Sequence, residues 1–277
     1  MTRLLLVTIL AAVAACGATF QPDIQYRVAD GLSLKMDASI PDGKGPFPTI
    51  ILVHGGGWRG GDKATTFKLI FDPLTRAGFA WFSVNYRMLP KYHYPAAVDD
   101  VVEAIRYVEA HAREYKVDRN RLAIAGESAG GHIVSLIGAR DGRKLHLAAV
   151  VAFYPVTDFD AAVEGPDKTR NAYRAVMDFL GVTELNDAVR QLMREASPVT
   201  YVNKGMPPFL FVHGTGDATV NFHQSEEMCA KMKRVGASCE IYAVAGAPHW
   251  IGNWEKNPEW QGYKQKVPAW LKQTLQR

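Results

Sequence analysis

Short, continuous runs of apolar residues alternate along the chain with longer segments whose apolar residues recur at helical spacing. Each apolar run has the length of a strand buried on both faces, as strands of a parallel sheet are. The runs predict strands over residues 48–53, 79–85, 121–126, 147–153, 209–212 and 240–244. The helical segments cover residues 64–77, 95–115, 129–139, 225–235 and 260–275. This alternation predicts an α/β fold, with a mostly parallel central sheet and helices on both of its faces.

Two segments depart from this alternation. Residues 24–29 and 32–38 flank an Asp30-Gly31 turn, which predicts a β-hairpin. From residue 157 to about 202 the buried-strand runs stop, and we interpret this segment as a small lid inserted over the edge of the sheet. Its partly helical stretches are residues 172–180 and 185–195.

The first residues have the pattern of an export signal. Arg3 precedes an apolar run, residues 4–15, that has the length of a signal-peptide hydrophobic region. Residues 13–16, Val-Ala-Ala-Cys, resemble a bacterial lipobox. We therefore expect residues 1–15 to be removed, Cys16 to be lipidated and a single α/β domain to span 16–277. Plain signal-peptidase cleavage is the alternative, and either route predicts an exported protein: periplasmic, membrane-anchored or secreted.

Export changes what the cysteines imply. Beyond Cys16, the chain has Cys229, in a helical segment, and Cys239, at the start of a predicted strand. An even pair in an oxidising compartment predicts a helix-to-strand disulfide, with two buried thiols as the alternative. No cysteine and histidine cluster has zinc-site spacing, so we expect neither a metal nor a cofactor.

The charge balance bears on possible partners. There are 32 Lys and Arg residues and 28 Asp and Glu residues, a net charge of +4, and the basic residues are scattered along the chain. We therefore expect no nucleic-acid partner. The membrane contact we expect is the lipid on Cys16, and the oligomeric state stays open.

A serine between glycines follows the predicted strand 121–126. Residues 126–130 read Gly-Glu-Ser-Ala-Gly, the pattern of a nucleophile elbow that lifts Ser128 out of the carboxyl edge of a sheet. The alternative is a glycine-rich turn in which Ser128 caps the following helix.

Three other predicted strands also end in residues suited to chemistry. His54-Gly-Gly-Gly-Trp follows the strand 48–53, Asp217 follows 209–212 and His249 follows 240–244. The order Ser128, Asp217, His249 is the order of the catalytic triad in α/β hydrolases.

The expected roles follow from the chemistry of the side chains. A serine hydroxyl needs a base, and the imidazole of His249 is suited to take and return its proton. A carboxylate, here Asp217, would orient the imidazole and stabilise its charged form. We expect backbone N–H groups of Gly55 or Gly56, together with Ala129, to bind the oxyanion.

Several other residues are candidates for lesser roles. Trp58 and Trp250 each follow a site motif, so we expect either substrate contact or packing, and Glu127 either bonds to neighbouring loops or contacts substrate. Asp158 is the weaker candidate for the triad acid. The remaining histidines are expected to be structural (His54, His132 and His213) or on the surface (His93, His111, His146 and His223).

Three motifs in one order resemble the α/β-hydrolase esterases of the hormone-sensitive-lipase-like and feruloyl/acetyl-xylan-esterase-like (BD-FAE-like) groups. They are residues 54–58, residues 126–131, and Tyr86-Arg87 followed by Tyr-Pro-Ala-Ala-Val-Asp-Asp at 94–100. The resemblance runs from about residue 24 to the end of the chain. It implies the α/β-hydrolase fold and a serine carboxylester hydrolase for short-chain, carbohydrate-linked or aryl esters, with an acyl-enzyme intermediate. A lid in mid-chain favours the carbohydrate-esterase branch over the hormone-sensitive-lipase-like one.

Two other functions fit the same residues. An amidase, formamidase or peptidase would use the same triad, although a prolyl-oligopeptidase-like propeller would not fit in 277 residues. A non-catalytic ligand binder on the hydrolase fold would be expected to lack a triad member.

Overall fold

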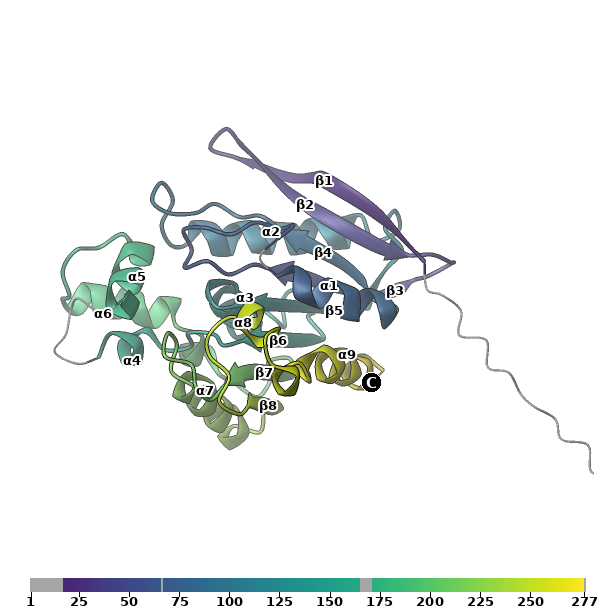
Figure 1. The fold of residues 1–277 in the computed structure, drawn as a ribbon. Coiled ribbons are helices and arrows are strands. Elements are labelled where there is room, and N and C mark those ends of the chain that lie inside the picture. The colour runs from purple at the N-terminus through teal and green to yellow at the C-terminus, as the bar shows by residue number, and fades with distance from the viewer. Residues whose placement is uncertain (1–16, 66, 165–170, 277) are drawn as a thin grey trace, which may run out of the picture.

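A computed structural model describes residues 17–65, 67–164 and 171–276. The predicted export signal and Cys16 lie outside these residues. Eight strands form a single sheet in the order β1-β2-β4-β3-β5-β6-β7-β8 (Figure 1). Their bounds are β1 (Ala18–Ala29), β2 (Leu32–Pro41), β3 (Phe47–Val53), β4 (Ala80–Val84), β5 (Val117–Glu127), β6 (Ala149–Phe153), β7 (Phe209–Gly214) and β8 (Cys239–Val244).

The sheet is parallel from β4 to β8, and the hairpin β1–β2 joins it antiparallel to β4. The predicted mostly parallel α/β sheet is therefore confirmed. Because the parallel strands all run the same way, their carboxyl ends share one edge, where the loops after β3, β5, β7 and β8 meet.

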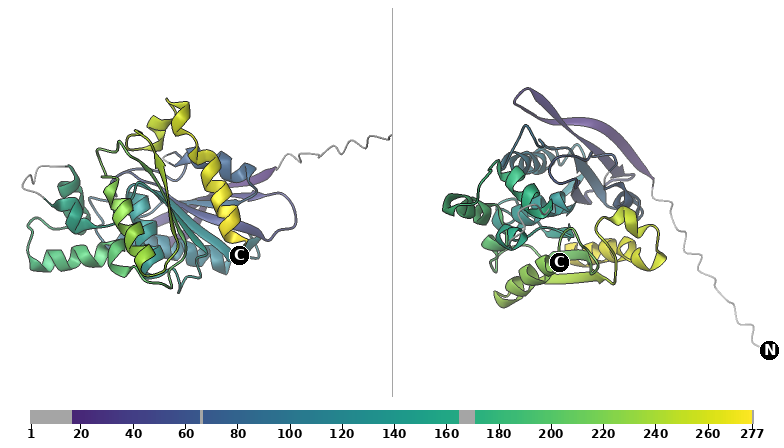
Figure 2. Two further views of the ribbon diagram at one scale, coloured as in Figure 1. Left: turned by 90° about the horizontal axis from the view of Figure 1, so that it is seen from below. Right: turned by 60° about the vertical axis from the view of Figure 1, so that its left-hand side comes forward.

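Two hydrophobic cores lie on opposite faces of the sheet. Alternate residues of a strand enter different cores, as Ile50 and Ile51 of β3 do. Helices α1 (Phe71–Arg76) and α9 (Tyr263–Leu275) cover one face. Helices α2 (Ala96–Ala110), α3 (Ala129–Arg140) and α7 (His223–Arg234) cover the other (Figure 2).

The segment between β6 and β7 carries short helices that lie beside the sheet, at the left of Figure 1. They are α4 (Phe159–Val163), α5 (Asn171–Leu180), α6 (Asp187–Ala196) and the 3-10 turn η2 (Pro198–Tyr201). Phe179 of α5 stacks on Trp58, with ring centroids 4.5 Å apart, and so fastens this lid segment to the loop after β3.

The element boundaries differ from the prediction where polar or proline residues mask the pattern. The single helix predicted over 64–77 is a 3-10 turn, η1 (Lys68–Ile70), followed by α1, because Pro73 is tolerated only in the first turn of a helix. Strand β5 begins at Val117, ahead of polar residues 118–121 that hide it in the sequence. The short elements α8 (Ile251–Trp254) and η3 (Pro258–Trp260) were not predicted.

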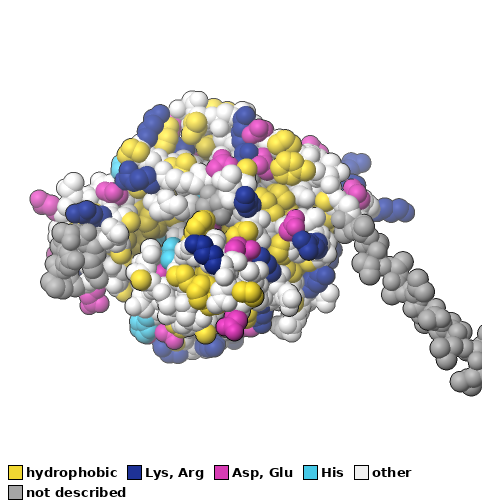
Figure 3. Space-filling model, viewed as in Figure 1, with side chains coloured by type: hydrophobic (Ala, Val, Ile, Leu, Met, Phe, Trp, Pro, Cys, Tyr) yellow, Lys and Arg dark blue, Asp and Glu magenta, His cyan; other side chains and the backbone are white. Residues whose placement is uncertain are grey.

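Within the described ranges, every helix is too short or too polar to cross a bilayer. On the face shown in Figure 3, basic and acidic side chains are interspersed.

Candidate active site

Ser128 is the single residue between the end of β5, at Glu127, and the start of α3, at Ala129. Its backbone has φ 52° and ψ −116°, a conformation that is unfavourable for a residue with a Cβ atom. Its N–H donates to the carbonyl of Phe153 on the neighbouring strand at 2.9 Å. The hydroxyl makes no capping hydrogen bond to α3, so the alternative of a helix cap does not describe this serine.

The two flanking glycines are needed for different reasons. A Cβ on Gly126 would lie 2.4 Å from the carbonyl oxygen of Gly130, so this glycine lets the helix fold back on its own strand. A Cβ on Gly130 would lie 2.2 Å from the carbonyl oxygen of Val53. That second glycine lets α3 pack against the end of β3, a contact that the motif alone does not reveal.

Ser128, His249 and Asp217 form a continuous hydrogen-bonded chain. The Nε2 atom of His249 lies 3.0 Å from Oγ of Ser128, and its Nδ1 atom lies 2.6 Å from Oδ2 of Asp217. Ser128 follows β5, Asp217 follows β7 and His249 follows β8, so the shared carboxyl edge brings together positions up to 121 residues apart.

Both oxygens of the Asp217 carboxylate accept hydrogen bonds. Oδ1 accepts the N–H groups of Thr219 at 2.8 Å and Val220 at 2.9 Å. Burial alone would raise the pKa of Asp217. Hydrogen bonds from His213 and His249, with the charge of His249, outweigh burial and hold the pKa below its usual range. The carboxylate therefore stays ionised opposite the imidazole.

His213 is a second histidine on this carboxylate. Its Nε2 atom lies 3.3 Å from Oδ2 of Asp217 and 3.0 Å from the carbonyl of Val220, and its Nδ1 atom lies 2.8 Å from the Ser225 hydroxyl. The sequence predicted a packed, hydrogen-bonded histidine but missed its contact with Asp217. The spacing of four residues from Asp217 was the available signal.

The glycine loop after β3 runs against the nucleophile. A Cβ on Gly55 would lie 3.2 Å from the Cβ of Ser128. The N–H of Gly55 faces the carboxylate of Glu127, where it opposes the rise in the pKa of that group. The candidate oxyanion donors stay Gly55 or Gly56, together with Ala129, which is the first residue of α3 and so belongs to the turn whose N–H groups have no partner within the helix.

Glu127 is 1% exposed, so the structure does not support substrate contact by this side chain. Its Oε2 atom accepts the hydroxyl of Tyr154 at 2.6 Å. Burial raises the pKa of Glu127 to about 7, against the opposing effects of the Tyr154 hydroxyl and the Gly55 N–H. Of the two roles expected for Glu127, the structure shows the hydrogen bond to a neighbouring segment.

The two tryptophans differ. Trp58 is 4% exposed and packs against Phe179 and His132, so of the two roles expected for it the structure shows packing, and the expectation of substrate contact is wrong. The aromatic lid residues bury it. Trp250 is 48% exposed beside His249 and stays a candidate for substrate contact.

The other sequence candidates lie elsewhere. His54 is buried and stacks on Tyr86, and burial lowers its pKa. His132 is buried against Trp58 and the carbonyl of Ala196, and burial lowers its pKa to about 4. Asp158 caps α4 by accepting the N–H of Ala161 at 3.2 Å. His93, His146 and His223 are exposed, whereas His111 is half-buried.

A cavity of about 500 Å³ lies beside Asp217, between the lid and the loop after β7. Its polar lining includes the side chains of Asn171, Thr219, Asn221 and Gln224. The cavity reaches the triad acid but not Ser128, so it adjoins the reacting centre from the acid side.

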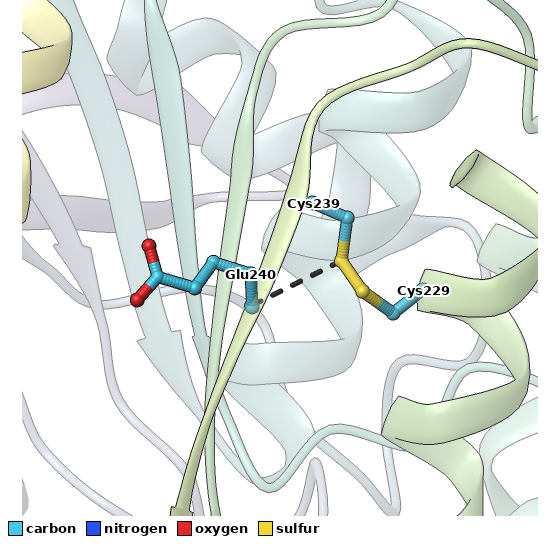
Figure 4. The surroundings of a disulfide bond; sticks show 3 residues. All are labelled: Cys229, Cys239 and Glu240. Carbon is cyan, nitrogen blue, oxygen red and sulfur yellow. Dashed lines mark hydrogen bonds between the residues drawn. A yellow bond between two sulfur atoms is a disulfide. The ribbon is translucent and has the colours of Figure 1, made fainter.

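A disulfide joins Cys229 of α7 to Cys239 of β8, with Cα atoms 5.6 Å apart (Figure 4). It therefore links a helix to the strand that leads to His249. Across the described part of the chain, no group of three or more His, Cys, Asp or Glu side chains is arranged to hold a metal ion.

Comparison with known proteins identifies relatives. The BD-FAE family model matches residues 36–232. The esterase LipC of Mycobacterium tuberculosis is 30% identical over 219 residues, which are 74% of this chain and 53% of that protein. The carboxylic ester hydrolase LipM of the same organism, described as probable, is 30% identical over 72% of this chain and 48% of its own length. The chain thus spans about half the length of these curated relatives.

Among solved structures, a truncated carbohydrate esterase from gut microbiota superimposes with a TM-score of 0.81 at 25% identity, over 94% of this chain and 97% of that one. The propionate-bound esterase Est2 of Thermogutta terrifontis has the same fold, with a TM-score of 0.74 at 23% identity over 96% of this chain and 97% of its own. With the family model matching well over half of its residues, the chain belongs to the BD-FAE family and has the α/β-hydrolase fold of its esterases.

Proposed function

We propose that this protein is a serine carboxylester hydrolase. The single observation that carries the proposal is the pair of contacts made by His249, 3.0 Å to the Ser128 hydroxyl and 2.6 Å to the Asp217 carboxylate. A serine hydroxyl within hydrogen-bond reach of an imidazole that is oriented by a carboxylate is the arrangement needed for nucleophilic catalysis.

Hydrolysis proceeds in two half-reactions. Oγ of Ser128 attacks the ester carbonyl while its proton passes to Nε2 of His249, and the N–H groups of Gly55 or Gly56 and of Ala129 stabilise the oxyanion. The alcohol then leaves with the proton from His249. Water attacks the resulting acyl-enzyme with His249 as the base again, which releases the acid and restores Ser128.

We propose carbohydrate-linked or other short-chain or aryl esters as the substrate class. The support comes from the carbohydrate esterase among the similar structures and from the polar lining of the cavity beside Asp217. An activity panel of acetyl, butyryl, longer acyl and feruloyl esters, together with acetylated xylan, would rank these substrates.

The test of the reaction is Ser128→Ala, with Ser135→Ala as the matched control because Ser135 is a buried serine further along α3. We expect Ser128→Ala to lower kcat on short p-nitrophenyl esters about 10³-fold or more, with an unchanged circular dichroism spectrum. Ser135→Ala should keep its activity. Near-normal hydrolysis by Ser128→Ala would exclude the mechanism, and faster cleavage of matched amides than of esters would favour the amidase alternative.

We also propose that the protein is exported and carries a lipid on Cys16. The lipobox-like sequence supports this, and the disulfide Cys229–Cys239 fits an oxidising compartment. Growth of a bacterial host with an alkyne-labelled fatty acid should label the wild type but not Cys16→Ser. Equal labelling of both proteins would contradict lipidation at this residue.

A further inference from the structure

The hydroxyl of Tyr154 links the residue before the nucleophile to the loop after the general base. It donates to Oε2 of Glu127 at 2.6 Å and accepts the N–H of Ile251 at 3.0 Å. All three residues are buried, with exposed fractions of 1% or less. In such surroundings hydrogen bonds are stronger than in water, and the loss of one partner leaves a buried polar group unsatisfied.

The ring of Tyr154 also supports the imidazole directly. Its centroid lies 4.6 Å from that of His249, with the planes inclined by 63°. On another side it packs edge-on against Trp254 of α8, at 5.7 Å. The backbone of Tyr154 has φ 36°, and its N–H is held by the carbonyl of Val212 at 2.9 Å. A bulky residue keeps such a φ only where its surroundings impose it.

Downstream of His249, side-chain hydrogen bonds join the loop to the short helix α8. Asn253 and Trp254 bond to the carbonyls of His249 and Pro248, at 3.1 and 2.7 Å, but they tie the loop only to α8. The bond from Ile251 ties this unit to Tyr154 at the end of β6.

We propose that Tyr154 is a positioning residue for His249 and that Glu127 is its anchor. The pair places the general base over Ser128 without touching substrate or the reacting atoms. This inference rests on the proposed function. It explains why the residue next to the nucleophile is a buried carboxyl group that does not face the substrate.

The kinetic test compares Tyr154→Phe with Tyr26→Phe. Tyr26 is a matched control because it is a buried tyrosine whose hydroxyl donates to the carbonyl of Asn85 at 2.6 Å, far along the sheet. We expect Tyr154→Phe to lower kcat about tenfold, since small misplacements of catalytic groups are costly, while KM changes by less than about twofold. Tyr26→Phe should show a similar loss in Tm with kcat unchanged. Equal kcat values in the two variants would overturn the proposal.

The anchor is tested by a pair of substitutions at Glu127. Glu127→Gln keeps an oxygen that accepts the Tyr154 hydroxyl, whereas Glu127→Met fills a similar volume without one. We expect the Met variant to behave like Tyr154→Phe and the Gln variant to keep kcat within about threefold of the wild type. An equal loss of kcat in the Gln and Met variants, or a raised KM in both, would overturn the anchor role of Glu127.

A readout that needs no turnover separates this inference from the proposed function. The proton on Nδ1 of His249, in its bond to Asp217, gives a downfield resonance whose position reports the placement of the ring. We expect it to shift in Tyr154→Phe and not in Tyr26→Phe, and an unshifted signal in both would overturn the positioning role. If the wild-type protein hydrolysed none of the esters, the proposed function would be contradicted, but the positioning role of Tyr154 would not.

Discussion

At the scale of single residues, three residues at the candidate site have a backbone conformation that is unfavourable for a residue with a Cβ atom. Ser128, Tyr154 and Trp250 have φ values of 52°, 36° and 74°, and all three lie in or beside the hydrogen-bonded chain of the site. A non-glycine residue in such a conformation costs about 1–3 kcal/mol, and the surrounding packing must supply that energy.

The elbow glycine Gly130 gives a prediction about stability. Gly130→Ala would place a Cβ 2.2 Å from the carbonyl oxygen of Val53, where only a movement of α3 or β3 relieves the clash. We expect the free energy of unfolding to fall by about 2 kcal/mol or more, measured by denaturant titration.

Gly60→Ala is the control for this substitution, since a Cβ there would have its nearest neighbour at 3.9 Å. We expect the control to stay within about 1 kcal/mol of the wild type. Equal stability of the two variants would show that the packing of α3 on β3 is looser than the structure indicates.

The buried carboxyl group of Glu127 predicts a pH-dependent stability. Its pKa is raised from near 4.5 to about 7, so the native state holds this proton more tightly than the unfolded chain does. The associated stability is present below pH 4.5 and is lost as the pH rises through about 7. We expect wild type to lose on the order of 3 kcal/mol relative to Glu127→Gln over this interval. If the free energy of unfolding changed with pH in the same way in the wild type and in Glu127→Gln, the burial of this carboxyl group would be contradicted.

At the scale of secondary-structure elements, strand register decides which residues meet. Gly126 of β5 pairs with Val53 of β3 on one side and Ala152 of β6 on the other. The strand ends are thus level across the centre of the sheet, and the nucleophile lies beside the glycine loop after β3. A shift of register by one residue would exchange the two faces of β5 and separate these groups.

The disulfide between α7 and β8 gives a prediction for this scale. It closes a short loop, with a sequence separation of 10, and the chain-entropy estimate for such a loop is about 2–3 kcal/mol. We expect the double variant Cys229→Ser, Cys239→Ser to lose about that much free energy of unfolding while keeping its esterase activity, because neither cysteine lies in the triad. An equal Tm for wild type with and without reductant would contradict a stabilising disulfide.

At the scale of the whole molecule, one buried carboxylate joins three distant segments. Asp100 of α2 is fully buried and accepts Arg27 of β1 at 2.8 Å. It also accepts Nε of Arg87, in the loop after β4, at 2.8 Å. Arg87 and Asp100 belong to the motif that carried the family resemblance. Their role in this structure is to hold the hairpin and α2 together.

We expect removal of the Asp100 carboxylate to lower the free energy of unfolding. Asp100→Ala removes the carboxylate that pairs with Arg27 and one of the two that pair with the largely buried Arg87, which keeps its contact with Asp30. We therefore expect a loss of about 3 kcal/mol in the free energy of unfolding. Asp72→Ala removes the exposed pair with Arg76 and should cost no more than about 1 kcal/mol. Similar losses in the two variants, measured by denaturant titration, would mean that Asp100 does not join the segments.

The prediction from sequence succeeded where periodicity is local. Apolar runs such as 147–153 and the helical spacing after Pro95 indicated the order of strands and helices, because burial on one or both faces imposes a pattern within a few residues. It missed the start of β5 at the polar residues 118–121 and the short helix α8, since neither has a periodic pattern.

The sequence by itself determined the class of fold and the residue types at each strand end, including Ser128, Asp217 and His249, because those depend on composition and order along the chain. The tertiary structure alone decided that Trp58 is buried against Phe179 of α5, that His213 contacts Asp217 and that Glu127 faces Tyr154. These facts depend on contacts between segments far apart in sequence, and the direction of a side chain there is set by packing and hydrogen bonding that no local pattern records.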